Sequence, residues 1–204
     1  FMAIKKIGVI GSGIVGQVLA SGFLKHGYSV TVGTRDPSKL EVWHAKEPLG
    51  QVGSFADAAR FGDLVVLAVA GGAAAEALSL AGLDHLEGKT VIDACNPISG
   101  APSAAGVLPF FTEGGESLLE RLQAAAPGAR FVKAFSCVGN ALFVNPQLPG
   151  GPPTMFICGA SAEAKQEVTT ILGQFGWDVA DMGAPEAARA IEPLCMLWCI
   201  QGFT

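Results

Sequence analysis

Short runs of consecutive apolar residues alternate along this chain with segments in which apolar residues recur at helical spacing. The run at residues 64–70 contains no polar side chain, which is typical of a parallel strand buried on both faces. The segment that begins at residue 14 carries apolar residues at the spacing of one helix face. The expected strands are residues 7–10, 28–32, 51–53, 64–70, 90–95, 130–135, 154–158 and 177–182. The expected helices are residues 14–24, 37–45, 54–59, 116–126, 162–175 and 184–201.

This alternation predicts an α/β fold built on a doubly wound parallel sheet. A length of 204 residues suits one domain, and we find no internal repeat and no linker. We therefore expect a single domain over residues 2–204. Its core would be residues 2–136, and residues 137–204 would add further strands and a closing helix.

A glycine motif links the first expected strand to the first expected helix. Its sequence is Gly11-Ser12-Gly13-Ile14-Val15-Gly16. In a dinucleotide site the first glycine allows the tight turn, the second lets a pyrophosphate approach the backbone, and the third packs helix against strand. Free N–H groups at the helix N-terminus then attract the phosphates. With 27 glycines in the chain such a motif can arise by chance as a structural turn. The strand before it and the helix after it favour an NAD(P)-binding Rossmann fold.

The residues after the second expected strand favour NADP over NAD. An NAD site has an acidic side chain at the end of this strand, to hold the ribose 2′-hydroxyl. Here Thr34 and Arg35 occupy that place, where they could bind a 2′-phosphate, and Lys39 could add a second cation. Asp36 lies about twenty residues after the glycine motif, as an NAD carboxylate does. Because Pro37 follows it, Asp36 also fits the cap of a helix.

Three later strand ends should reach the same edge of the sheet, where open α/β sheets bind their ligands. Ala70 and Gly71 follow the fourth strand, where small residues would admit the cofactor or form an ordinary turn. Asn96 and Pro97 follow the fifth, and the Asn96 amide would either bind the nicotinamide end or serve as a turn residue. The sixth strand leads to a candidate substrate-binding segment, formed by Ser136, Cys137 and Val138.

Composition narrows the classes of partner. Half of the residues are hydrophobic and the net charge is −5, which argues against nucleic acid or an anionic membrane surface as partner. No apolar run approaches the roughly 18 residues of a transmembrane helix. The first residues show no signal-peptide pattern.

The five cysteines are an odd number without paired spacing, which favours free thiols and a cytoplasmic location. Cys195 and Cys199 would share one helix face, but without further ligands they suit core packing better than a metal. We therefore expect no metal site. The His, Glu and Lys residues form no acid–base group in the sequence, and we assign no catalytic residue.

The chain resembles the family of F420-dependent NADP oxidoreductases, and is similar to the oxidoreductase domains of six-transmembrane metalloreductases. The likeness rests on IGVIGSGIVG at residues 7–16, VGTR at 32–35, VKAF at 132–135 and ARAIEP at 188–193. It implies that Thr34 and Arg35 receive the NADP 2′-phosphate. It also implies a deazaflavin over the nicotinamide, near residues 96–97, 136–139 and the loop up to residue 153. Many relatives carry Asn-Thr where this chain has Ser136 and Cys137.

We expect hydride transfer between NADPH and a small flavin-like acceptor, with coenzyme F420 favoured. Hydride transfer depends on aligned rings more than on an acid or a base. Two alternatives share the same motifs. One is an NADPH-dependent flavin or ferric reductase, and the other is a non-catalytic NADP(H)-binding sensor. The apolar final helix suggests a homodimer.

Overall fold

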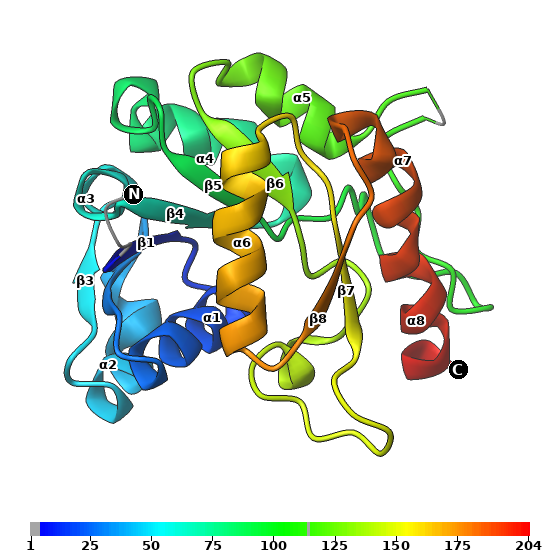
Figure 1. Cartoon of the computed structure of the whole chain (residues 1–204), viewed down its shortest axis with the longest axis horizontal. Coiled ribbons are helices and arrows are strands. Elements are labelled where there is room, and N and C mark those ends of the chain that lie inside the picture. The colour runs from blue at the N-terminus through cyan, green and yellow to red at the C-terminus, as the bar shows by residue number, and fades with distance from the viewer. Residues whose placement is uncertain (1–4, 114) are drawn as a thin grey trace.

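Parallel pairing of six strands forms the central sheet of the computed structural model, which describes residues 5–113 and 115–204 (Figure 1). The strand order is β3-β2-β1-β4-β5-β6, the order of a dinucleotide-binding Rossmann domain. The predicted fold class is therefore confirmed. Residues 2–4 of the expected domain lie outside the described residues. The strands are β1 Lys6–Ile10, β2 Ser29–Gly33, β3 Gln51–Gly53, β4 Leu64–Leu67, β5 Thr90–Asp93 and β6 Arg130–Lys133.

Helices cover both faces of this sheet, as a doubly wound fold requires. The helix α1 Ile14–Lys25 and the later α6 Ala162–Gln174 pack on one face. The other face carries α3 Phe55–Phe61, α4 Ala74–Ala81 and α5 Leu118–Ala125. A 3₁₀ turn, Pro37–Leu40, leads into the short helix α2 Glu41–Lys46 beside the sheet edge.

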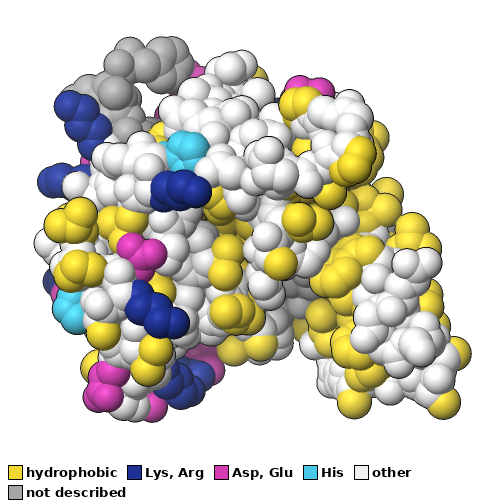
Figure 2. All heavy atoms as spheres, turned by 90° about the horizontal axis from the view of Figure 1, so that it is seen from below, with side chains coloured by type: hydrophobic (Ala, Val, Ile, Leu, Met, Phe, Trp, Pro, Cys, Tyr) yellow, Lys and Arg dark blue, Asp and Glu magenta, His cyan; other side chains and the backbone are white. Residues whose placement is uncertain are grey.

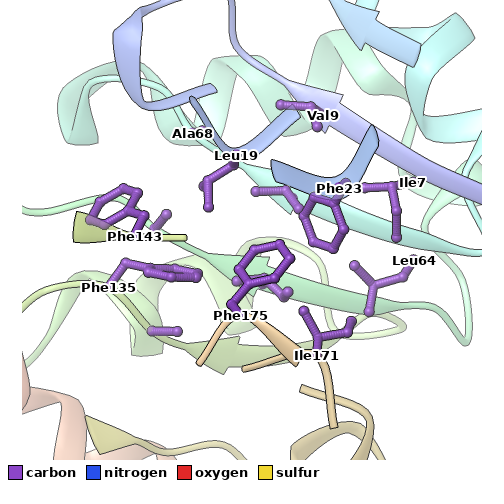
Figure 3. Packing of buried hydrophobic residues seen from close by; sticks show 14 of the residues in the cluster. Ile7, Val9, Leu19, Phe23, Leu64, Ala68, Phe135, Phe143, Ile171 and Phe175 are labelled. Atoms are coloured by element: carbon purple, nitrogen blue, oxygen red, sulfur yellow. The ribbon is translucent and has the colours of Figure 1, made fainter. Parts of the chain in front are cut away.

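Alternation along the strands divides the core into two layers. In β4, Leu64 and Val66 join the cluster under α1 and α6, and Val65 and Leu67 join the opposite cluster. Figure 3 shows the first cluster, where Phe23 and Phe175 meet with ring centroids 5.0 Å apart. Every residue of β4 is fully buried, as the unbroken apolar run predicts.

The C-terminal part adds a second, two-stranded parallel sheet. It consists of β7 Thr154–Ile157 and β8 Asp178–Asp181, with α6 between them in the sequence. A single antiparallel bridge joins Cys158, just after β7, to Lys133 of the main sheet. The extra strands are therefore confirmed, and they form a separate sheet beside the β6 edge of the large one.

The expected final helix is divided. Residues 184–201 form a 3₁₀ turn Pro185–Ala187, then α7 Ala188–Ile191 and α8 Pro193–Phe203. The division falls at Glu192 because Pro193 has no N–H to continue the helical ladder. The helix α8 carries no charged residue and exposes Leu197, Trp198 and Phe203. Figure 2, in which α8 stays on the right, shows many hydrophobic side chains on that side.

Three strands of the main sheet end two or three residues earlier than their apolar runs predict. The strand β4 ends at Leu67 rather than residue 70, β5 at Asp93 and β6 at Lys133. The backbone N–H of the residue after each strand still donates a hydrogen bond to the neighbouring strand. The chain then turns out of the sheet. The helix α4 was missed by the sequence prediction. It starts directly after the turn that begins at Gly71.

A buried ion triad joins the two halves of the chain. The ammonium of Lys133 has no exposed surface and lies 2.8 Å from Asp93 Oδ2 and 2.9 Å from Glu192 Oε1. It also donates to the Cys95 carbonyl at 2.7 Å. Burial alone lowers the pKa of Lys133, but the two carboxylates more than offset this and hold its pKa above the ordinary value. The fold thus brings together three titratable residues that lie far apart in the sequence.

The carboxylates of the triad are satisfied by the backbone. Asp93 Oδ1 accepts from the Cys95 N–H at 2.9 Å. The two oxygens of Glu192 accept from the N–H groups of Leu118 and Leu119, each at 3.0 Å. These N–H groups open α5, so the negative charge of Glu192 faces the positive end of a helix.

We expect Lys133→Met to lower the free energy of unfolding by about 3–5 kcal/mol, because two buried carboxylates would lose their counter-ion. Urea denaturation followed by circular dichroism measures this. Arg121→Met is the control, since Arg121 pairs with Glu116 on the surface, where an ion pair is worth at most about 1 kcal/mol. A loss for Lys133→Met no larger than that of the control would contradict the role of the triad.

Candidate functional site

The glycine motif forms a tight turn between β1 and α1. Gly11 has a φ of +130°, and a Cβ there would lie 2.1 Å from the Ala68 carbonyl oxygen. A Cβ on Gly16 would lie 2.1 Å from the Gly11 oxygen, so α1 packs directly against the turn. Gly13 differs from both, because a Cβ there would meet no protein atom within 4 Å. The protein therefore needs Gly11 and Gly16 for its own packing, whereas the space beside Gly13 is open to a ligand.

The N-terminus of α1 faces that open space. Gly13 is its N-cap residue and provides no side-chain cap, so the first N–H groups of the helix, at Ile14 and Val15, are left for a ligand. The loop is held by Gln17, whose Nε2 donates to the Ser12 carbonyl at 2.8 Å. Backbone N–H groups and the helix dipole together favour an anion here.

Thr34 lies under the loop and is buried, with 6% of its surface exposed. Its hydroxyl donates to the Asp36 carbonyl at 3.0 Å, and its oxygen lies 2.9 Å from the hydroxyl oxygen of Ser12. It also accepts from the Asp36 N–H. The structure thus engages the Thr34 hydroxyl inside the protein.

Asp36 caps the 3₁₀ turn at Pro37–Leu40. Its carboxylate accepts from the Ser38 hydroxyl at 2.7 Å and from the Ser38 N–H at 3.1 Å. These hydrogen bonds lower the pKa of Asp36. Of the two roles that the sequence left open, the structure places Asp36 in the capping role.

Two neighbouring cavities lie along the carboxyl edge of the sheet. The first has a volume of about 260 Å³ and the second about 410 Å³, and they share Gly13, Ala68, Val69 and Ala70. The first brings together the glycine loop, the end of β2 and α4. Its lining comprises Gly11, Ser12, Gly13, Thr34, Arg35, Asp36, Lys39, Phe55, Ala68, Val69, Ala70, Ala73, Glu76, Ala77 and Leu80.

The second cavity is apolar apart from one amide. Its lining comprises Gly13, Ile14, Val15, Ala68, Val69, Ala70, Gly71, Ala94, Asn96 and Ile98. None of these residues carries a titratable side chain. The Oδ1 atom of Asn96 is buried and has no hydrogen-bond partner within the described protein. A buried acceptor without a partner is costly, so this atom is suited to a donor from a bound ligand.

Gly71 lines the second cavity, whereas Pro97 does not. A Cβ on Gly71 would lie 2.1 Å from the Asn96 carbonyl oxygen, so glycine is required there by backbone packing. Pro97 is buried and lies outside the cavity lining. Its carbonyl accepts from the Phe111 N–H at 2.9 Å, which fixes the loop that carries Ile98.

The candidate substrate-binding segment lies apart from both cavities. Among the described residues, the linings of the two cavities do not include Ser136, Cys137 or Val138. Ser136 is buried, and its carbonyl accepts from the Trp198 indole N–H at 3.0 Å. Cys137 and Val138 pack against the first core cluster. Burial raises the pKa of the Cys137 thiol, which reduces its nucleophilicity at neutral pH.

Several cavity residues escaped the sequence prediction. Glu76, Ala77 and Leu80 come from α4, and Phe55 comes from the start of α3. The apolar spacing in residues 74–81 was a signal for α4, but its alanines are too small to define a helix face clearly. In the part of the chain that the structure describes, no group of His, Cys, Asp and Glu could hold a metal ion. None of the described helices is long and apolar enough to cross a membrane.

Comparison with known proteins places this geometry in a family. The model of the family described as NADP oxidoreductase, coenzyme F420-dependent, matches residues 6–97. A crystal structure from Arthrobacter sp. FB24, provisionally named an F420-dependent NADP-reductase, is 34% identical, with a TM-score of 0.88. The match covers 96% of this chain and 92% of that one. The chain belongs to the F420-dependent NADP oxidoreductase family. It is therefore grouped with the NADP-dependent oxidoreductases.

Longer relatives match the same residues. Rat metalloreductase STEAP3 (Rattus norvegicus) is 30% identical over 190 residues, which are 93% of this chain and 36% of the rat protein. Human metalloreductase STEAP2 (Homo sapiens) is 27% identical over 198 residues, covering 92% of this chain and 35% of the human protein. The chain thus spans about a third of the length of these curated relatives. A reductive aminase from Aspergillus terreus shares the fold, with a TM-score of 0.68, 20% identity, and coverage of 98% of this chain and 62% of that one.

We expect Gly13→Ala to weaken NADPH binding by about tenfold or more, or 1.4 kcal/mol, because its Cβ would occupy the space that a pyrophosphate needs. Calorimetric titration measures this. The same variant should lose at most about 1 kcal/mol of stability, since Gly13 is an N-cap without packing contacts. Gly16→Ala is the contrasting variant, with an expected loss of about 1–3 kcal/mol from overpacking. Normal NADPH affinity in Gly13→Ala would contradict the assignment.

Proposed function

We propose that this chain transfers a hydride between NADPH and a small flavin-like acceptor, with coenzyme F420 favoured. The observation that carries the proposal is the second cavity, which adjoins the glycine loop and has no titratable residue in its lining. A hydride moves between aligned rings without general acid or base catalysis. A cavity of about 410 Å³ is within the range of small-molecule sites.

The residues present suit three parts of NADPH. The space beside Gly13 and the N-terminus of α1 suit the pyrophosphate. Arg35 and Lys39 line the first cavity, where their charges suit the 2′-phosphate. The unpartnered Oδ1 of Asn96 would accept a hydrogen bond from the carboxamide or the ribose at the nicotinamide end. When bound, NADPH supplies the hydride.

The protein's own contribution is to bind, orient and exclude water. Ala68, Val69 and Ile98 give the second cavity apolar walls, which keep water from competing with the acceptor. Asn96 would fix the orientation of the nicotinamide ring through its amide. The carbonyl of Cys95, the residue before it, is held by the buried Lys133. The position of Asn96 thus depends on the interior of the protein.

The preference for F420 as the acceptor rests on likeness to the family. The family description and the Arthrobacter neighbour both name F420, which supports it. The likeness to rat STEAP3 supports the alternative of a flavin or ferric reductase. We also propose a small-molecule acceptor rather than nucleic acid or membrane as partner, and a homodimer through α8. The five free cysteines suit a reducing compartment such as the cytoplasm.

We expect NADPH oxidation, followed by absorbance, to be fastest when F420 is offered as the acceptor. FMN and a ferric chelate are offered in separate reactions with the same enzyme and the same NADPH concentration. Turnover with FMN or iron alone would replace F420 by the reductase alternative. Tight NADPH binding without turnover of any acceptor would contradict the enzymatic proposal and favour a sensor.

We expect Arg35→Ala to weaken NADPH binding by about 1.5–3 kcal/mol, the value of a hydrogen bond to a charged group. Binding of NADH should change little, because NADH has no 2′-phosphate. Calorimetric titration of both cofactors measures the difference. Arg60→Ala is the matched control, since Arg60 is an exposed arginine on α3 that pairs with Asp57 and lies outside both cavity linings. Equal losses for NADPH and NADH would refute the phosphate role.

A further inference from the structure

An ion pair joins two of the elements that line the first cavity. Arg35 follows β2 and Glu76 lies in the first turn of α4, and both line the cavity of about 260 Å³. Arg35 Nη1 lies 3.5 Å from Glu76 Oε1, and each side chain is 62% exposed. A pair this long and this exposed contributes little free energy. The arginine is therefore easily released to a stronger partner.

The charges around this cavity are balanced. Its lining contains two cations, Arg35 and Lys39, and two carboxylates, Asp36 and Glu76. The carboxylate of Asp36 is occupied by both donors of Ser38. In the described lining, Glu76 is thus the carboxylate that pairs with Arg35. A phosphate monoester carries about −1.5 to −2 charges, so a 2′-phosphate at Arg35 would meet Glu76 as a competitor of the same sign.

We propose that Glu76 is a specificity-determining residue that opposes the 2′-phosphate. It holds Arg35 when no cofactor is bound and repels the phosphate when one is. Glu76 therefore lowers the affinity for NADPH and leaves the affinity for NADH unchanged. The preference for NADPH over NADH, which Arg35 creates, becomes smaller. This inference rests on the proposed binding of NADPH. It adds an opposing group to the site rather than another ligand.

The test compares ligands with and without the phosphate. We expect Glu76→Gln to bind NADPH and 2′,5′-ADP about 2–5-fold more tightly, the gain from freeing an exposed ion-pair partner. Binding of NADH and 5′-AMP should be unchanged, and calorimetry measures all four ligands. The gain should shrink as salt is raised, because exposed charges are screened.

The matched control is Glu163→Gln. Glu163 is 63% exposed and pairs with Arg130 at 3.0 Å, and it lies outside the cavity lining, so all four affinities should stay at their wild-type values. A second control combines Arg35→Ala with Glu76→Gln. In that background the gain from Glu76→Gln should fall, because neighbouring residues that act on one ligand are not additive.

Two results would overturn the inference. Unchanged or weaker binding of 2′,5′-ADP by Glu76→Gln would show that the carboxylate does not oppose the phosphate. An equal change for 2′,5′-ADP and 5′-AMP would show that Glu76 acts on the adenosine instead. Failure of the NADPH binding on which this inference rests has a different signature, because wild-type protein would then bind NADPH and NADH equally or not at all. Failure of the hydride transfer alone appears as NADPH binding without turnover of any acceptor.

Discussion

The rest of the structure depends on the buried ion pairs that the ammonium of Lys133 forms. A charge without exposed surface must be neutralised locally, and here Asp93 and Glu192 provide the opposite charges. The ammonium contacts Asp93 at the end of β5, the carbonyl of Cys95 in the loop after it, and Glu192 between the C-terminal helices. Replacing such a group by apolar residues often costs nothing, whereas removing one partner is severe. The triad thus specifies how the parts meet more than it adds stability.

The triad also explains why the site can be built from loops. The strands β4 and β5 end early, and their continuations turn outward to form the cavity walls. Loops of this kind need anchors to hold a ligand in one geometry. Lys133 holds the Cys95 carbonyl from inside, and Gly71 packs its backbone against Asn96. The binding surface is therefore fixed from the interior outward.

Local patterns predicted most of the fold. The glycine motif, the Asp36-Pro37 cap and the apolar strands each contain their own signal within a few residues, so the structure agrees with them. The triad was not predictable in this way, since Lys133 and Asp93 lie 40 residues apart and only the fold brings them together. Two segments of the family resemblance, VKAF and ARAIEP, do contain Lys133 and Glu192. The presence of both residues in these segments was the one sign in the sequence that they share a role.

The candidate site was predictable to different degrees along its length. Residues at the first turn after a strand, such as Gly13, Arg35 and Asn96, line the cavities because strand direction alone places them. Glu76 required the unpredicted helix α4. Ser136 is drawn inward because its carbonyl accepts from Trp198 of α8, a contact between distant parts of the chain. Sequence position beside a sheet edge therefore indicates proximity to the site, but not which way a segment faces.

The two cavities differ in the charge of their lining residues. All four charged lining residues belong to the first cavity, and the second has none. Changes at Arg35 or Glu76 should therefore alter cofactor affinity and leave the hydride step alone. Under the proposed function, acceptor choice would then arise in the walls of the second cavity. Its outer wall includes Ile98, which packs with Leu108 against Cys195 and Cys199 of α8. The divided C-terminal helix thus contacts the wall of the second cavity through Cys195 and Cys199 of α8, and joins the triad through Glu192 at the division.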